Sequence, residues 1–153
     1  MDQLNNLMAR VSGLSDAQRL YRFQSEGIVG CIVDRWWARD ALCTHGTTEV
    51  DLLSTDQGLD LADLLGTQAS LLTRTADGGS WQRSGLVHQA RRLGSDGGLV
   101  RYRVSLASWT WWLQHTRSSR VFQKQSVRQI VDSVLGQHGA LAGGGGGGGG
   151  DAF

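Results

Sequence analysis

The sequence contains no proline and only two cysteines, Cys31 and Cys43, among its 153 residues. Two cysteines are too few for the disulfide framework that holds small secreted domains together, so we expect two half-buried thiols. Without proline, the tight turns must rely largely on the 22 glycines, which adopt positive φ angles at little cost. The composition therefore indicates a protein that has free thiols, makes its tight turns with glycine and is held together by a hydrophobic core.

Long hydrophobic runs are also missing. No stretch approaches the roughly 18 apolar residues of a membrane-spanning helix. The first ten residues, MDQLNNLMAR, lack the basic start and apolar stretch of a secretory signal peptide. We therefore expect a protein that is cytoplasmic at synthesis.

Motifs for catalysis and cofactor binding do not occur. The sequence has no G-x-S-x-G nucleophile elbow and no Walker phosphate loop. The glycine tract Gly143–Gly150 follows no strand and opens no helix, so it is not a dinucleotide site. The four histidines are scattered, and Cys43 and His45 have no second pair of ligands for zinc. We expect no enzymatic activity, no metal and no cofactor.

The clearest pattern is a strand that follows the turn Ser95–Gly98, whose Asp-Gly and Gly-Gly steps suit a tight hairpin. Its residues alternate between two faces, with Val100, Tyr102, Val104 and Leu106 on one and Arg101, Arg103 and Ser105 on the other. At Ala107 the period changes. Trp109, Trp112 and Leu113 then recur at helical spacing, which predicts a short helix after the strand.

A second helix is predicted by the apolar stripe of Val127, Ile130, Val131, Val134 and Leu135. Ser126 precedes it and Gln129 lies three residues on, which is the pattern of a capping box. Gly136 or Gly139 would end this helix in the left-handed conformation. Ser15–Gln18 is a second capping box, within a segment that reads as helical.

Further elements complete a chain of antiparallel strands. Strand patterns cover residues 28–37, 47–54, 67–74 and 81–93, and a short apolar stripe predicts a helix over 58–66. Antiparallel strands joined by tight turns usually curl into a barrel or sandwich. The fold class is therefore mainly β with short flanking helices (α+β), built on an antiparallel β-barrel module.

Four regions follow from these patterns. We expect an N-terminal helical segment at 1–27, the β-barrel module at 28–108, a helical segment at 109–139 and a glycine-rich flexible tail at 140–153. The 109–139 segment would begin the next part of a larger assembly. Since a flexible tether of glycines leads here to only three more residues, we also expect that the chain is a truncated fragment.

Charge and tryptophan suggest where partners bind. Residues 1–79 carry six basic and eleven acidic residues, whereas residues 80–139 carry nine and two. This asymmetry fits an anionic partner, self-association or a solvated arginine face. Consecutive strand residues face opposite ways, so one of Trp36 and Trp37 must lie outside the core. The candidate interface residues are Trp36, Trp37, Trp109, Trp111, Trp112, Arg101 and Arg103. Stacking on single-stranded nucleic acid is the alternative role for these side chains.

The ordered segments resemble a known family. They are VDRWWARDAL, VDLLSTD, LDLADLLG, LGSDGGLVRYRVSLASWTWWL and SSRVFQKQSVRQIVDSVL. From about Ile28 to Gly139 the chain resembles the N-terminal part of VgrG-type spike proteins of the type VI secretion system, which are similar to phage tail baseplate hubs. Cys43–Thr48 departs from the serine-aromatic sequence that the family has at this point.

The resemblance implies a structural role in protein delivery. It predicts a β-barrel of the phage tail hub type, a homotrimer in the full-length parent, and docking on the hexameric secretion-tube protein and other baseplate components, with effector cargo as a further partner. The rest of the hub, the neck and the needle have no counterpart in this sequence, which is the second reason to expect truncation. A full-length parent would be exported through the type VI apparatus without a signal peptide.

Overall fold

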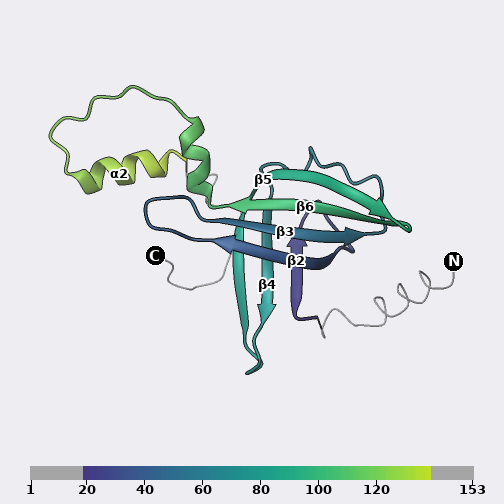
Figure 1. Cartoon of the computed structure of the whole chain (residues 1–153). Coiled ribbons are helices and arrows are strands. Elements are labelled where there is room, and N and C mark those ends of the chain that lie inside the picture. Colours follow the sequence, from purple (N-terminus) through teal and green to yellow (C-terminus); the bar gives the residue numbers. More distant parts are fainter. Residues whose placement is uncertain (1–18, 139–153) are drawn as a thin grey trace. The chain divides into compact units, whose positions relative to one another are not determined.

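The computed structural model describes residues 19–138, and its strands form a single antiparallel sheet. The six strands are β1 (Tyr21–Ser25), β2 (Ile32–Arg39), β3 (Thr47–Ser54), β4 (Gln68–Arg74), β5 (Ser80–Asp96) and β6 (Leu99–Ala107). Their order across the sheet is β1-β4-β5-β6-β3-β2, so β1 and β2 form its two edges (Figure 1). The chain divides into two compact units between Ser108 and Trp109.

The long strand β5 forms the corner of the sheet. Its first half, up to Leu86, pairs with β4, and from Leu86 onward it pairs with β6 (Figure 1). Gly85 lies at this change of partner. A Cβ atom there would stand 2.7 Å from the carbonyl oxygen of Ala107, so only glycine lets the two backbones approach this closely.

The predicted hairpin and strand alternation are confirmed. Asp96 pairs with Leu99 across the two-residue turn Gly97-Gly98, and both glycines have positive φ angles, 55° and 90°. Along β6, Val100, Tyr102, Val104 and Leu106 are all buried. The arginines between them point to the opposite face of the sheet, because strand side chains alternate.

The hydrophobic core lies on one face of the sheet, here called the inner face. Its buried cluster contains Ile28, Val50, Leu52, Leu64, Ala69, Leu71, Val87, Val104 and Leu106. Tyr21 on β1 and Trp36 on β2 pack against this cluster and against each other, with ring centroids 5.9 Å apart. The sheet therefore curls until side chains of its two edges meet, although no strand pairing joins β1 to β2 within residues 19–138.

The N-terminal prediction is wrong where it can be compared. Residues 1–27 were expected to be helical, but Tyr21–Ser25 forms strand β1, which pairs with β4. Tyr21 and Phe23 face the core while Arg22 and Gln24 alternate with them, and this period of two outweighs the weak helical pattern. The predicted capping box at Ser15–Gln18 lies outside the described residues.

Two further segments differ from the prediction. Residues 58–66 form turns rather than a helix: Asp60 caps one turn through the backbone N–H of Ala62, and Gly66 has a φ of 81°. The turns still bury Leu64 completely over the core. The predicted strand at 28–37 begins only at Ile32, since Gly30, with a φ of 75°, interrupts the extended backbone before it.

The second unit contains two helices by itself. Trp109–His115 forms the 3-10 helix η2, and Val127–Gly136 forms helix α2. The predicted capping box is confirmed, because the Ser126 N–H donates to Gln129 Oε1 at 2.8 Å and the Ser126 hydroxyl accepts from the Gln129 N–H. The helix ends at Gly136, but its C-cap, Gln137, is right-handed with a φ of −73°, so the predicted left-handed stop is not found there. Gly139 and the predicted tail at 140–153 lie outside the described residues.

Candidate functional site

The outer face of the sheet, opposite the core, carries a row of charged residues centred on Asp51. In the strand register Asp51 on β3 lies directly opposite Arg35 on β2 and Arg103 on β6. Arg103 Nε donates to Asp51 Oδ1 at 2.6 Å and Arg103 Nη2 donates to Oδ2 at 2.9 Å. Arg35 Nε donates to Oδ2 at 2.9 Å. The carboxylate is therefore held from both sides by guanidinium groups of the neighbouring strands.

Asp51 is completely buried beneath these arginines. The hydrogen bonds from Arg103 lower the pKa of the Asp51 carboxyl from its ordinary value, and they outweigh the burial that would raise it. The same hydrogen bonds raise the pKa of Arg103. Both groups stay charged near neutral pH, so the row is a fixed ion-pair network rather than an acid or base prepared for catalysis.

Trp37 covers this network from the solvent side. The Arg103 guanidinium lies 4.3 Å from the centroid of the Trp37 ring, within the range of a cation–π contact. The Trp37 residue nevertheless remains 40% exposed, whereas its neighbour Trp36 packs on the core. The prediction that these two consecutive tryptophans face opposite ways is confirmed. Glu49, whose carboxylate lies 3.7 Å from Arg103, completes this side.

Arg101 belongs to the same network through Asp34, with 3.3 Å between Arg101 Nε and Asp34 Oδ2. The pairing of β2 with β3 shifts register between Val33 and Arg35, which leaves Asp34 as the extra residue of a bulge. We call the whole set the outer-face cluster: Asp34, Arg35, Trp37, Glu49, Asp51, Arg101 and Arg103. Because Arg101 and Arg103 are both paired with carboxylates, nothing in their surroundings favours the alternative of nucleic-acid binding.

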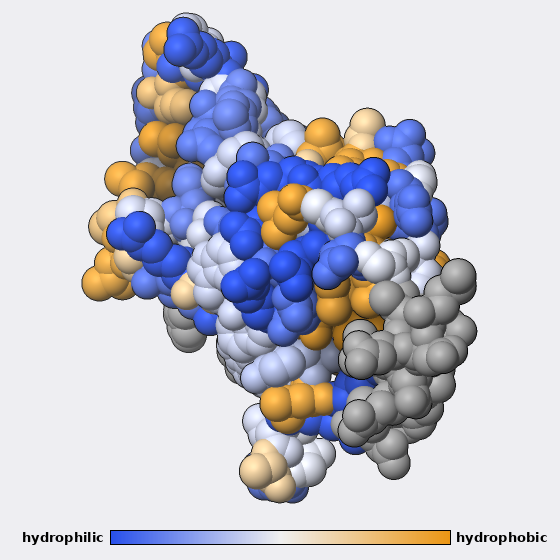
Figure 2. All heavy atoms as spheres, turned by 45° about the vertical axis from the view of Figure 1, so that its right-hand side comes forward, coloured by the Kyte–Doolittle hydropathy of each residue, from blue (hydrophilic) through white to orange (hydrophobic). Residues whose placement is uncertain are grey.

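The side of the molecule shown in Figure 2 is not a continuous hydrophobic surface. Figure 2 shows one side of the molecule, where hydrophilic side chains predominate and hydrophobic ones form separate small groups. No helix within residues 19–138 is long and apolar enough to cross a membrane.

The other predicted tryptophans lie in the second unit. Trp111 and Trp112 meet edge to face with ring centroids 5.3 Å apart, and the His115 ring lies 4.5 Å from Trp111. Trp109 begins the same short helix. The structure therefore brings together Trp37, Arg101 and Arg103 of the predicted interface, places Trp36 on the core, and puts Trp109, Trp111 and Trp112 on the short helix η2 of the second unit.

Sequence reasoning missed the acidic half of the outer-face cluster. The alternation of Glu49 and Asp51 along residues 47–54 was visible, as was that of Arg101 and Arg103, but the adjacency of the two strands was not.

The two cysteines differ in their exposure. Cys31 is half-buried, and burial raises the pKa of its thiol. Cys43 is exposed, which corrects the expectation of two half-buried thiols. No group of three metal-ligating side chains occurs in the described part of the chain.

The comparisons with known proteins agree with one another on a single family. Residues 39–144 match the phage tail baseplate hub (GPD) family. The chain is 32% identical over 127 residues to the type VI secretion system spike protein VgrG1b of Pseudomonas aeruginosa, and the match covers 82% of this chain and 17% of that protein. Spike protein VgrG4b of the same organism is 35% identical over 94 residues, which cover 61% of this chain and 11% of the relative.

A solved structure shows the same fold. It is the E. coli c3393 protein, a component of the type VI secretion system with structural similarity to the T4 bacteriophage tail proteins gp27 and gp5. The TM-score is 0.63 at 23% identity, and the match covers 74% of this chain and 31% of that one. The match to VgrG1b, by comparison, spans about one sixth of the length of that spike protein.

Proposed function

The chain belongs to the phage tail baseplate hub family, and from this premise we propose that it is a structural hub module of a type VI secretion spike, with a non-catalytic role in protein delivery. The family match over residues 39–144 carries the proposal. The curled antiparallel sheet supports it, because a sheet of this kind offers a rigid surface on which other subunits can pack.

The proposal also covers the closure of the sheet into a barrel and the assembly of the parent protein. In the assembled parent protein the sheet forms a barrel, a homotrimer of the parent sits on the hexameric secretion-tube protein, and other baseplate components and effector cargo attach to it. The ring contact between Tyr21 and Trp36 supports the barrel, since it already brings the two sheet edges within side-chain reach. The parent would be made in the cytoplasm and exported through the apparatus.

The outer-face cluster is proposed as a protein-contact surface of this assembly. Tryptophan and arginine are the residue types that most often dominate the binding energy of protein interfaces. Arg103 is fixed by Asp51 and supports the Trp37 ring from one side, so ordering the indole on binding costs less entropy. A preorganised, partly exposed indole is suited to be buried by a neighbouring subunit.

A chimeric spike tests the proposed role. The matched segment of VgrG1b is exchanged for the corresponding residues of this chain, and release of the tube protein from cells is measured. We expect the chimera to support release. A Trp37→Ala chimera should release several-fold less, whereas Leu93→Ala, which removes a large apolar side chain of similar exposure, should not. A chimera that folds but never assembles would count against the hub role.

A further inference from the structure

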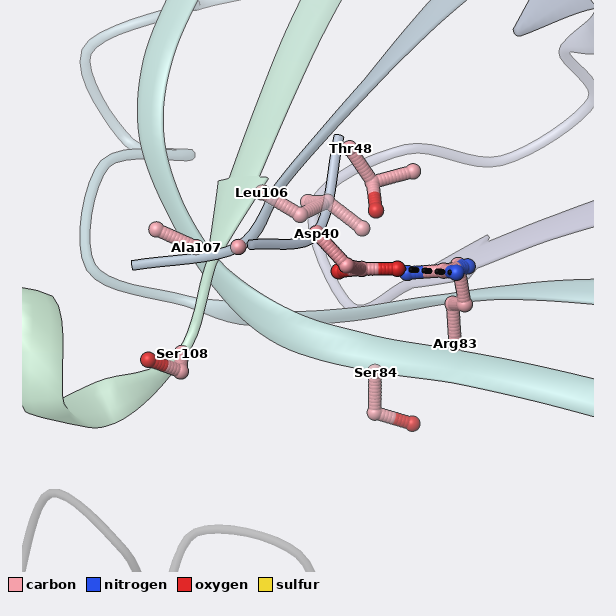
Figure 3. Close-up of a pocket in the computed structure, with 8 residues that line it drawn as sticks. Asp40, Thr48, Arg83, Ser84, Leu106, Ala107 and Ser108 are labelled. Carbon is pink, nitrogen blue, oxygen red and sulfur yellow. Dashed lines mark hydrogen bonds and ion pairs between the residues drawn. The ribbon is translucent and has the colours of Figure 1, made fainter. Parts of the chain in front are cut away.

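A pocket of about 230 Å³ lies where the loop after β2 meets the first half of β5, away from the outer-face cluster. Its lining residues are Asp40, Gly46, Thr48, Arg83, Ser84, Leu106, Ala107 and Ser108. In Figure 3 the side chains of Asp40 and Arg83 point toward each other across this pocket and are joined by dashed contacts. Arg83 Nη2 donates to Asp40 Oδ2 at 2.5 Å.

Arg83 has hydrogen-bonding capacity that Asp40 does not use. Its Nε is buried and finds no acceptor among the residues that the structure describes. The guanidinium also rests 4.6 Å from the centroid of the Trp81 ring, which fixes its plane. Arginine binds a carboxylate best through two parallel N–H groups, so this pairing leaves the arginine only partly satisfied.

The position of Asp40 allows its carboxylate to be displaced from Arg83. Its side chain is 58% exposed, against 25% for Arg83, and it starts the connection from β2 to β3, in which Leu42 is 95% exposed. The carboxylate lies over Gly46, where an added Cβ would stand 2.6 Å from Asp40 Oδ1. An exposed ion pair of this kind is weak and is readily exchanged for a better partner.

We propose that this pocket is a binding site for a glutamate or aspartate side chain of an acidic segment in a partner protein, which replaces Asp40 on Arg83. Asp40 itself shows that the site accepts a carboxylate with a single negative charge. A phosphate carries a larger charge than this single arginine balances, and the displaced Asp40, which repels any anion at the site, would repel a phosphate more strongly than a carboxylate. The proposal does not depend on the role as a spike module.

The test uses the 153-residue chain and nuclear magnetic resonance of its arginine Nε–H groups. The probes are the peptide acetyl-Gly-Glu-Gly-amide, its Gln counterpart and inorganic phosphate. We expect the Arg83 Nε–H signal to shift with the Glu peptide alone. Asp40→Asn should bind that peptide about two- to fivefold tighter, the gain expected when an exposed ion pair no longer competes.

Two variants keep the test decisive. Asp40→Ala removes the competing side chain altogether, and it should strengthen binding in the same direction as Asp40→Asn. Arg83→Met should abolish binding. The proposal is overturned if the Arg83 signal stays unmoved in both Asp40→Asn and Asp40→Ala, if the Gln peptide moves it equally, or if phosphate binds there more tightly than the Glu peptide.

Discussion

Arg103 and Asp51, 52 residues apart in sequence, form a two-point ion pair in which the carboxylate is fully buried. This pair joins the neighbouring strands β3 and β6 on the face opposite the core, and it also holds the ring of Trp37. The outer face therefore has a buried ion pair that ties its strands together, whereas the inner face is held by apolar packing.

Replacing Asp51 by Asn should lower the free energy of unfolding by about 1.5–3 kcal/mol, because hydrogen bonds to a buried charge are lost and two arginines keep their charge without it. Asp34→Asn is the matched control. Its side chain is 30% exposed, so the loss there should stay below about 1 kcal/mol. Urea unfolding at pH 7 measures both. Equal losses in the two variants would show that the burial of Asp51 has no energetic consequence.

The same pair makes stability depend on pH. The pKa of Asp51 is lower in the folded chain than its ordinary value of 3.8, so its contribution is complete at neutral pH and is lost as the pH falls through the folded pKa. The difference in unfolding free energy between the unchanged chain and Asp51→Asn should be constant at neutral pH and shrink below about pH 4. Urea unfolding at pH 7, 5, 4 and 3 gives this difference, and a constant value throughout contradicts the assignment.

The corner of β5 should not tolerate a larger residue. Gly85→Ala places its Cβ against the backbone of Ala107 and should destabilise the chain by about 1–3 kcal/mol. Gly94→Ala, in the same strand but with open space around the new Cβ, should change stability by no more than about 1 kcal/mol. Thermal unfolding of the two variants compares them directly. A tolerated alanine at position 85 would mean that the strands approach less closely than we describe.

Helix α2 should depend on its cap. Ser126→Ala removes the hydroxyl that accepts from the Gln129 N–H and should cost about 1 kcal/mol of helix stability. Ser133→Ala, at an exposed position in the middle of the same helix, should stabilise it slightly. Hydrogen exchange of the α2 amides distinguishes the two: protection should fall in the first variant and rise or stay level in the second.

Local patterns predicted the elements whose residues determine their own conformation. The alternation in 47–54 and 100–106, the Gly97-Gly98 turn and the Ser126 capping box were all readable. Strand β1 was not, because five residues carry little signal and its pairing with β4 lies almost 50 residues away. The turns at 58–66 were mistaken for a helix because Leu64 is buried by tertiary packing rather than by an amphipathic helix.

The basic and aromatic residues of the candidate site could be predicted from local patterns, but its acidic residues could not. Arg101, Arg103 and the outward side chain of the Trp36–Trp37 pair follow from strand alternation alone. Their partners Asp34 and Asp51 follow only from the order of strands in the sheet and from the bulge at Asp34, neither of which leaves a local trace in the sequence.

The central claim, that this chain is a hub module whose outer face packs against a neighbouring subunit, is tested most directly by hydroxyl-radical footprinting of Trp37. Its oxidation rate is measured in the isolated chain and in the assembled chimeric spike, with a tryptophan-containing peptide added to both samples as the reference. We predict that assembly slows the oxidation of Trp37 several-fold relative to that peptide. An unchanged ratio in a fully assembled spike would contradict the account.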